Sequence, residues 1–188
     1  WYDDGKILNK KNTFYDFIDA TKSLIETGYG NSKLVFAMGG SAGGLLMGAV
    51  INMEPELYTG IISAVPFVDV VTTMSDESIP LTTFEYKEWG NPANKDEYDY
   101  IRSYSPYDNI KPSNYPAVLV TSSLFDSQVQ YFEPAKYVPK LRENSTSDNP
   151  ILMKMNLVGG HAGKSGRLNA LEESALDNAF LINLTTSI

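Results

Sequence analysis

The sequence predicts an α/β fold in which helices cover both faces of a parallel β-sheet. Short apolar segments with the length of buried strands alternate along the chain with longer segments whose apolar residues recur at helical spacing. Strands that alternate with helices pair in parallel, because each helix returns the chain to the start of the next strand. The 188 residues, 43% of them hydrophobic, are sufficient for one domain with a hydrophobic core.

Four apolar runs are expected to form the strands. Each is short, and glycine, proline or polar residues bound it. Pro66 closes the second run, because proline cannot donate a hydrogen bond to a neighbouring strand. The expected strands are residues 33–38, 60–65, 117–123 and 151–158.

Four segments are expected to form helices. In the first, Thr13 is suited to be the N-cap and Gly28 to be the residue that stops the helix. In the third, Pro134 fits the first turn, whereas Pro139 lies inside and should strain or kink the helix. The expected helices are residues 13–28, 42–53, 134–143 and 168–184.

The alternation is lost between residues 67 and 115. This segment is polar and aromatic, and Asp, Glu, Pro and Tyr are prominent in it. It is too long for a simple connection between two strands, and long insertions in compact domains usually carry function. We therefore expect it to contribute to a binding site or to a lid.

The most informative residue is Ser41, which lies where an apolar run breaks into glycines. The string Gly39-Gly40-Ser41-Ala42-Gly43 matches the nucleophile elbow, a tight strand-to-helix turn that exposes a serine Oγ in strained backbone geometry. Ala42 opens the next helix, so its free N–H is expected to point to the place where an oxyanion forms. The string predicts acyl transfer with Ser41 as the nucleophile.

A serine nucleophile needs a base and a group that orients the base. His161, the only histidine, follows the last expected strand, and Asp126 follows the strand at 117–123. The carboxyl ends of parallel strands share one edge, so all three side chains are expected there. The order serine, aspartate, histidine is that of α/β-hydrolases. Each residue alone has an ordinary structural explanation, but together they predict an α/β-hydrolase with Ser41, Asp126 and His161 as its triad.

Composition excludes several other kinds of protein. The formal charge of −8 and the lack of a dense Lys/Arg cluster argue against nucleic-acid binding, and an acidic surface favours cationic ligands. The absence of cysteine and the single histidine rule out disulfides and sites with several imidazole ligands. No metal or organic cofactor is expected. No apolar run is long enough to span a membrane and the first residues do not resemble a signal peptide, so a cytoplasmic location is expected.

Two glycine-rich strings resemble nucleotide-binding motifs but lack a required glycine. Residues 159–165 end in Gly-Lys-Ser, but a phosphate-binding loop requires glycine where Val158 stands. Residues 39–44 do not fit the dinucleotide fingerprint, because serine and alanine occupy the place of its second glycine. Neither string predicts nucleotide binding.

Several longer strings are more specific than the triad. They are residues 12–14, 39–44, 65–70, 80–83, 88–92, 103–109, 126–129 and 163–167. In these strings, and over essentially all of its 188 residues, the chain resembles the catalytic domain of the oligopeptidase B group in the prolyl oligopeptidase family of serine peptidases.

The resemblance implies an endopeptidase that cleaves short peptides after Arg or Lys. It implies that Ser41 is the nucleophile, that Asp126 and His161 are its partners, and that the Ala42 amide lies in the oxyanion hole. It further implies that Glu85 binds the basic side chain of the substrate. A second acid is usual two positions later, but Lys87 stands there and is expected to weaken the attraction for a cation.

The family's amino-terminal β-propeller and first hydrolase strands, with an oxyanion-hole tyrosine, have no counterpart in residues 1–188. We therefore expect a partial hydrolase domain with weak activity or none. The strand that leads to Ser41 is expected to be an unpaired edge, which tends to recruit another chain. Self-association through this edge is the expected consequence.

Two alternatives stay open at this point. The triad does not reveal whether an ester or an amide is cleaved, so an esterase or lipase of the same fold is one of them. The other is a non-catalytic binding module that retains the triad residues without using them.

Overall fold

The computed structural model describes residues 1–163 and 165–186 and contains a four-stranded parallel sheet. The strands are β1 (Phe36–Gly40), β2 (Gly60–Ala64), β3 (Ala117–Ser123) and β4 (Ile151–Asn156). They lie side by side in chain order, with β1 and β4 at the two edges. Lys164, within the string 163–167, lies outside the described residues.

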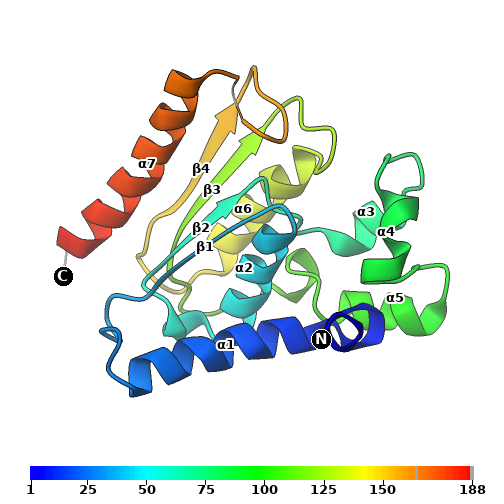
Figure 1. Ribbon diagram of the computed structural model, residues 1–188, viewed down its shortest axis with the longest axis horizontal. Helices are drawn as coiled ribbons and strands as arrows, with labels where there is room; N and C mark the ends of the chain where they lie inside the picture. Colours follow the sequence, from blue (N-terminus) through cyan, green and yellow to red (C-terminus); the bar gives the residue numbers. More distant parts are fainter. Residues whose placement is uncertain (164, 187–188) are drawn as a thin grey trace.

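Helices cover both faces of the sheet, which confirms the predicted fold class (Figure 1). One face packs against α1 (Lys11–Glu26), α2 (Ala42–Met53) and α6 (Phe132–Asn144). The other packs against α7 (Arg167–Thr186), the red and orange helix in Figure 1.

Alternating side chains of the strands build the two cores. Ile61 and Val118 belong to the larger core, whereas their neighbours Ile62 and Leu119 belong to the smaller one under α7. Successive residues of a strand point to opposite faces, so a strand buried on both sides is apolar throughout. Phe180 is the buried α7 residue of the smaller core. The central strands are therefore fixed from both sides, and their carboxyl ends form a rigid edge.

The insertion between β2 and β3 contains three short helices that the sequence did not reveal. They are α3 (Val70–Met74), α4 (Thr82–Trp89) and α5 (Lys95–Arg102), the green group beyond the sheet in Figure 1. Each has eight residues or fewer, too few for a clear helical periodicity. Of these three helices, only α5 has a side-chain N-cap, in which Asn94 Oδ1 accepts the Asp96 N–H at 3.1 Å.

For α1, the predicted end of the helix is confirmed and the predicted N-cap is wrong. Gly28 adopts φ 78° immediately after the helix, as expected of the residue that stops it. The assignment of Thr13 as N-cap was wrong, because the helix begins at Lys11 and the Thr13 hydroxyl donates to the Lys10 carbonyl at 2.8 Å. A preceding 3₁₀ turn at Ile7–Asn9 leads directly into the helix, and the Tyr100 hydroxyl accepts the N–H of its first residue, Lys11, at 3.1 Å.

The first strand is displaced from the predicted range of 33–38. The Thr59 hydroxyl holds residues 33–35 instead, accepting from the Val35 N–H and donating to the Lys33 carbonyl. The ladder with β2 begins at Phe36 and runs through Gly40. Tertiary pairing here outweighs the low strand propensity of glycine. The helix predicted at 134–143 extends over 132–144 and continues through Pro139.

Among the described residues, no helix combines the length and apolar character needed to cross a membrane. The part of the chain covered by the structure also holds no group of three or more Asp, Glu or His side chains suited to a metal ion. The cytoplasmic location stays a prediction.

Candidate active site

Ser41 occupies a strained turn between β1 and α2. Its backbone has φ 56° and ψ −118°, a combination that non-glycine residues rarely adopt and that structures maintain mainly at functional sites. The Ser41 N–H donates to the Ala64 carbonyl at 2.9 Å, which extends the β1–β2 pairing to the serine itself. The nucleophile elbow predicted from the sequence is therefore present.

Close backbone contacts explain the glycines around the serine. A Cβ on Gly39 would lie 2.3 Å from the Gly43 carbonyl oxygen, and a Cβ on Gly44 would lie 2.5 Å from Pro66. A Cβ on Gly43 would meet nothing within 4 Å. Gly39 therefore makes the tight turn possible, as the sequence pattern indicated. Gly44 lets α2 approach Pro66, and this role could not be predicted from the sequence.

Ala42 is the first residue of α2 and lines the cavity beside Ser41. The first N–H groups of a helix have no acceptor within the helix, so they can bind an anion. Two later amides, of Gly44 and Leu45, both donate to the Ser41 carbonyl. This arrangement makes the Ala42 N–H suited to an oxyanion that forms at Ser41.

Asp126, which is buried, and His161, which is partly buried, form a pair after the carboxyl ends of β3 and β4. Asp126 Oδ2 lies 2.8 Å from His161 Nδ1, and the Asp126 side chain is fully buried. Asp126 Oδ1 accepts the N–H groups of Gln128 and Val129 at 2.8 and 2.9 Å. A carboxylate held in this way orients the imidazole with Nδ1 as donor, which leaves Nε2 free to accept a proton.

The loop that carries His161 is shaped by Asn156 at the end of β4. Asn156 Oδ1 accepts the N–H groups of Val158 and Gly159 at 3.1 and 3.0 Å. A Cβ on Gly159 would lie 2.5 Å from Asn156 Nδ2, and one on Gly160 would lie 3.5 Å from the Phe125 carbonyl. Residues 157–163, called here the histidine loop, therefore contact residues 124–131, called here the aspartate loop, which the sequence pattern did not show.

The structure brings the predicted triad residues to one edge of the sheet. Ser41 shares a cavity with Gln128 and Val129, the residues whose amides hold Asp126. Within residues 1–163 and 165–186 the hydrogen bonds include the Asp126–His161 contact but none between Ser41 and His161. In substrate-free enzymes this contact is often long and shortens when substrate binds.

The cavity beside Ser41, called here the Ser41 cavity, has mostly apolar walls and one carboxylate. Glu85 supplies the carboxylate from α4, and Trp89 Nε1 donates to Glu85 Oε2 at 2.6 Å. A carboxylate has further acceptor capacity, so Glu85 can still bind a cation. The cavity is lined by Ser41, Ala42, Phe67, Thr73, Met74, Ile79, Leu81, Thr82, Glu85, Trp89, Gln128 and Val129.

Lys87 is exposed and does not line the Ser41 cavity. Residues two apart on a helix differ in direction by about 200°, so Glu85 and Lys87 leave α4 on different sides. No helix was predicted in this segment from the sequence, so the directions of the two side chains could not be separated. The expectation that Lys87 opposes a basic side chain in the site therefore has no structural support.

The close approach of Gly39 to Gly43 leads to a test of the elbow. Replacing Gly39 with Ala is expected to lower the free energy of unfolding by about 2 kcal/mol or more, because backbone must move to admit the methyl group. The same variant should lose labelling of Ser41 by a fluorophosphonate. Gly43→Ala is the control and should change stability by less than about 1 kcal/mol and keep the labelling. Normal labelling of Gly39→Ala would contradict the account of the turn.

Comparison with known proteins shows to which family the chain belongs. A profile described as "Prolyl oligopeptidase family" matches residues 1–187. Dipeptidyl aminopeptidase BI of Pseudoxanthomonas mexicana is 58% identical over 183 residues, which are 97% of this chain and 25% of that protein. Protease 2 of Moraxella lacunata is 54% identical over 183 residues, 97% of this chain and 26% of that protein. The chain thus spans about a quarter of the length of these relatives.

Solved structures give the same result for the fold. Oligopeptidase B from Leishmania major superimposes with a TM-score of 0.94 at 47% identity, over 97% of this chain and 26% of that one. Oligopeptidase B from Trypanosoma brucei, solved with covalently bound antipain, has a TM-score of 0.94 at 48% identity and the same coverage. The sheet is therefore part of an α/β-hydrolase fold, and the chain belongs to the prolyl oligopeptidase family of serine peptidases.

Proposed function

We propose that this chain provides the triad of a serine endopeptidase that cleaves short peptides after Arg or Lys. The observation that carries the proposal is the contact of the buried Asp126 with His161 at the sheet edge where the strained Ser41 precedes α2. Family membership supports the reaction class, and relatives named Protease 2 and oligopeptidase B support a peptide substrate.

In the proposed reaction, His161 Nε2 takes the hydroxyl proton of Ser41 as Oγ attacks the peptide carbonyl carbon. Asp126 holds the imidazole through Nδ1 and stabilises the cation that forms. The tetrahedral oxyanion accepts a hydrogen bond from the Ala42 N–H. His161 then gives the proton to the leaving amine, and water hydrolyses the acyl-enzyme by the same steps. Loss of one donor from an oxyanion hole costs roughly a hundredfold in rate or more, so a site with Ala42 alone would be weak.

The Ser41 cavity supports a preference for basic side chains. Its apolar walls, which include Phe67 and Trp89, fit the aliphatic stem of Arg or Lys, and Glu85 fits the cationic end. The carboxylate is oriented before substrate binds, because Trp89 Nε1 holds one of its oxygens. We assign Glu85 the binding of the P1 side chain.

The assignment of Glu85 is tested with amino-terminally blocked Arg and norleucine amides. In Glu85→Gln the ratio of kcat/KM for Arg over norleucine is expected to fall about fivefold or more, because an ion pair in a partly screened site contributes about 1 to 4 kcal/mol. The norleucine reaction itself should change little. An unchanged ratio would remove Glu85 from the P1 site.

Lys87→Gln is the matched control for this experiment. Lys87 lies two residues along the same helix and is exposed, so its replacement should leave the Arg preference unchanged. Hydrolysis of the blocked amides also distinguishes an endopeptidase from an enzyme that requires a free amino terminus, a distinction raised by the name dipeptidyl aminopeptidase of one relative.

We also propose that the 188-residue chain self-associates through β1. Among the described strands, β1 pairs only with β2, so one side of its backbone is unpaired. Met38 on this strand is 58% exposed. An unpaired edge with an exposed apolar side chain favours pairing with a second copy.

Sedimentation at micromolar concentration tests this proposal. The chain is expected to sediment as a dimer or larger species, and Met38→Lys should shift it towards monomer, because a charge on an edge strand opposes pairing. Ile182→Lys on the exposed face of α7 is the control and should leave the distribution unchanged. A monomer at every concentration would contradict the proposal.

A further inference from the structure

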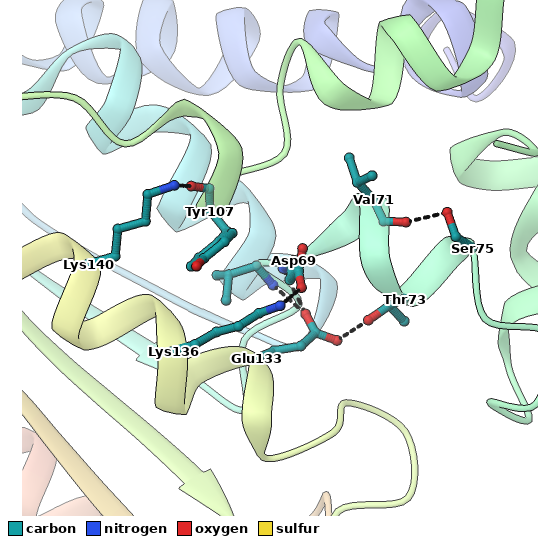
Figure 2. A network of polar contacts seen from close by, with 9 residues as sticks. Asp69, Val71, Thr73, Ser75, Tyr107, Glu133, Lys136 and Lys140 are labelled. Atoms are coloured by element: carbon teal, nitrogen blue, oxygen red, sulfur yellow. Dashed lines mark hydrogen bonds and ion pairs between the residues drawn. The ribbon is translucent and has the colours of Figure 1, made fainter. Parts of the chain in front are cut away.

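Glu133 is a buried carboxylate that the proposed reaction does not use. It lies in the first turn of α6, and none of its surface is exposed. Its Oε2 accepts the N–H groups of Val68 and Asp69 at 3.0 and 2.8 Å, and its Oε1 lies 2.6 Å from the Thr73 hydroxyl (Figure 2). All three partners belong to one segment, residues 67–74, called here the wall segment.

The wall segment forms one side of the Ser41 cavity. Phe67, Thr73 and Met74 line the cavity. The Phe67 N–H donates to the Ser41 carbonyl at 3.1 Å, and the next two amides donate to Glu133. Three successive amides therefore attach the wall segment to the nucleophile on one side and to α6 on the other.

The chain that leads into α6 forms another side of the same cavity. Gln128 and Val129 line it and donate to Asp126, and the Glu133 N–H donates to the Gln130 carbonyl at 3.0 Å. Glu133 is thus bonded through its backbone to the aspartate loop and through its side chain to the wall segment. A shift of the Glu133 side chain would therefore change the distance between the wall segment and the cavity residues Gln128 and Val129.

The charged groups near Glu133 lie on the wall segment and on α6. Asp69 on the wall segment pairs with Lys136, one turn further along α6 (Figure 2). Lys136 also lies over the Tyr107 ring, and Lys140 donates to the Tyr107 carbonyl at 2.7 Å. Burial, and to a smaller extent the neighbouring Asp69, raises the pKa of Glu133 to about 8, whereas its hydrogen bonds oppose the shift.

The contacts of Glu133 do not require one protonation state. As a carboxylate it accepts from all three donors. As a neutral acid it can still accept both amides at Oε2 while Oε1–H donates to the Thr73 oxygen. A glutamine side chain can reproduce this second pattern with its carbonyl and NH₂ groups, and a methionine side chain of similar length can reproduce neither pattern.

We propose that Glu133 is a positioning residue for substrate: its three hydrogen bonds hold the wall segment against the aspartate loop and so fix the shape of the Ser41 cavity. This inference rests on the proposed function only for its kinetic consequence. The structural consequence can be measured without catalysis.

The test compares Glu133→Met, Glu133→Gln and the control Glu143→Met in the complete gene product. Glu143 is an exposed residue of the same helix. Amide hydrogen exchange at residues 67–74 should become roughly tenfold faster or more in Glu133→Met, because two buried amides lose their acceptor. Exchange in β3 should be unchanged, and Glu133→Gln and the control should resemble the wild type.

The kinetic measurement uses the blocked Arg amide. Glu133→Met is expected to raise KM roughly tenfold with a smaller change in kcat, and Glu133→Gln should restore the wild-type KM. A purely structural role would lower thermal stability without this split between KM and kcat. If no form cleaves the Arg amide, the proposed function fails while the exchange result still decides the role of Glu133.

A second variant covers the case in which Glu133→Met does not fold. Lys136→Met keeps the acceptor of both buried amides but removes the ion pair between α6 and the wall segment, and so leaves the buried Asp69 carboxylate without its cation. It is expected to accelerate exchange at residues 67–74 severalfold and to raise KM in the same direction. Unchanged exchange in the wall segment of whichever Glu133→Met or Lys136→Met protein folds would overturn the proposal.

Discussion

The site depends on the way in which one buried carboxylate is satisfied. Asp126 accepts two backbone amides with one oxygen and faces His161 Nδ1 with the other. A buried charge without partners would be strongly unfavourable, so these contacts fix both the loop after β3 and the direction of the imidazole. The amides come from Gln128 and Val129, which also line the Ser41 cavity. The orientation of the His161 imidazole and the shape of the Ser41 cavity therefore depend on one set of hydrogen bonds.

The parallel sheet supplies the frame for these contacts. Strands β1, β3 and β4 deliver Ser41, Asp126 and His161 to one edge, and the cores on both faces keep the strands in register. The edge also carries the strain at Ser41. Such strain persists only where the surroundings determine the conformation, and here the Ala64 carbonyl and the contact of Gly39 with Gly43 do so.

The features that the sequence predicted are those with a strong local pattern. The apolar strands, the glycines around Ser41 and the order of Ser41, Asp126 and His161 predicted the fold. They also predicted that the loops carrying these three residues lie at one edge of the sheet. The start of α1 and the displacement of β1 could not be predicted, because a 3₁₀ turn and the Thr59 side chain decide them. The short helices of the insertion have no periodicity to detect. Glu133 resembles an ordinary acid in the first turn of a helix, and only its burial reveals its contacts.

The central claim is that Asp126, His161 and Ser41 act as one unit. The most direct measurement is the rate of fluorophosphonate reaction at Ser41 in Asp126→Asn compared with the wild type. The substitution keeps the shape of the side chain but favours the wrong imidazole tautomer, so the rate is expected to fall by about 10³- to 10⁴-fold without loss of the fold. An unchanged rate in a folded Asp126→Asn protein would contradict the account.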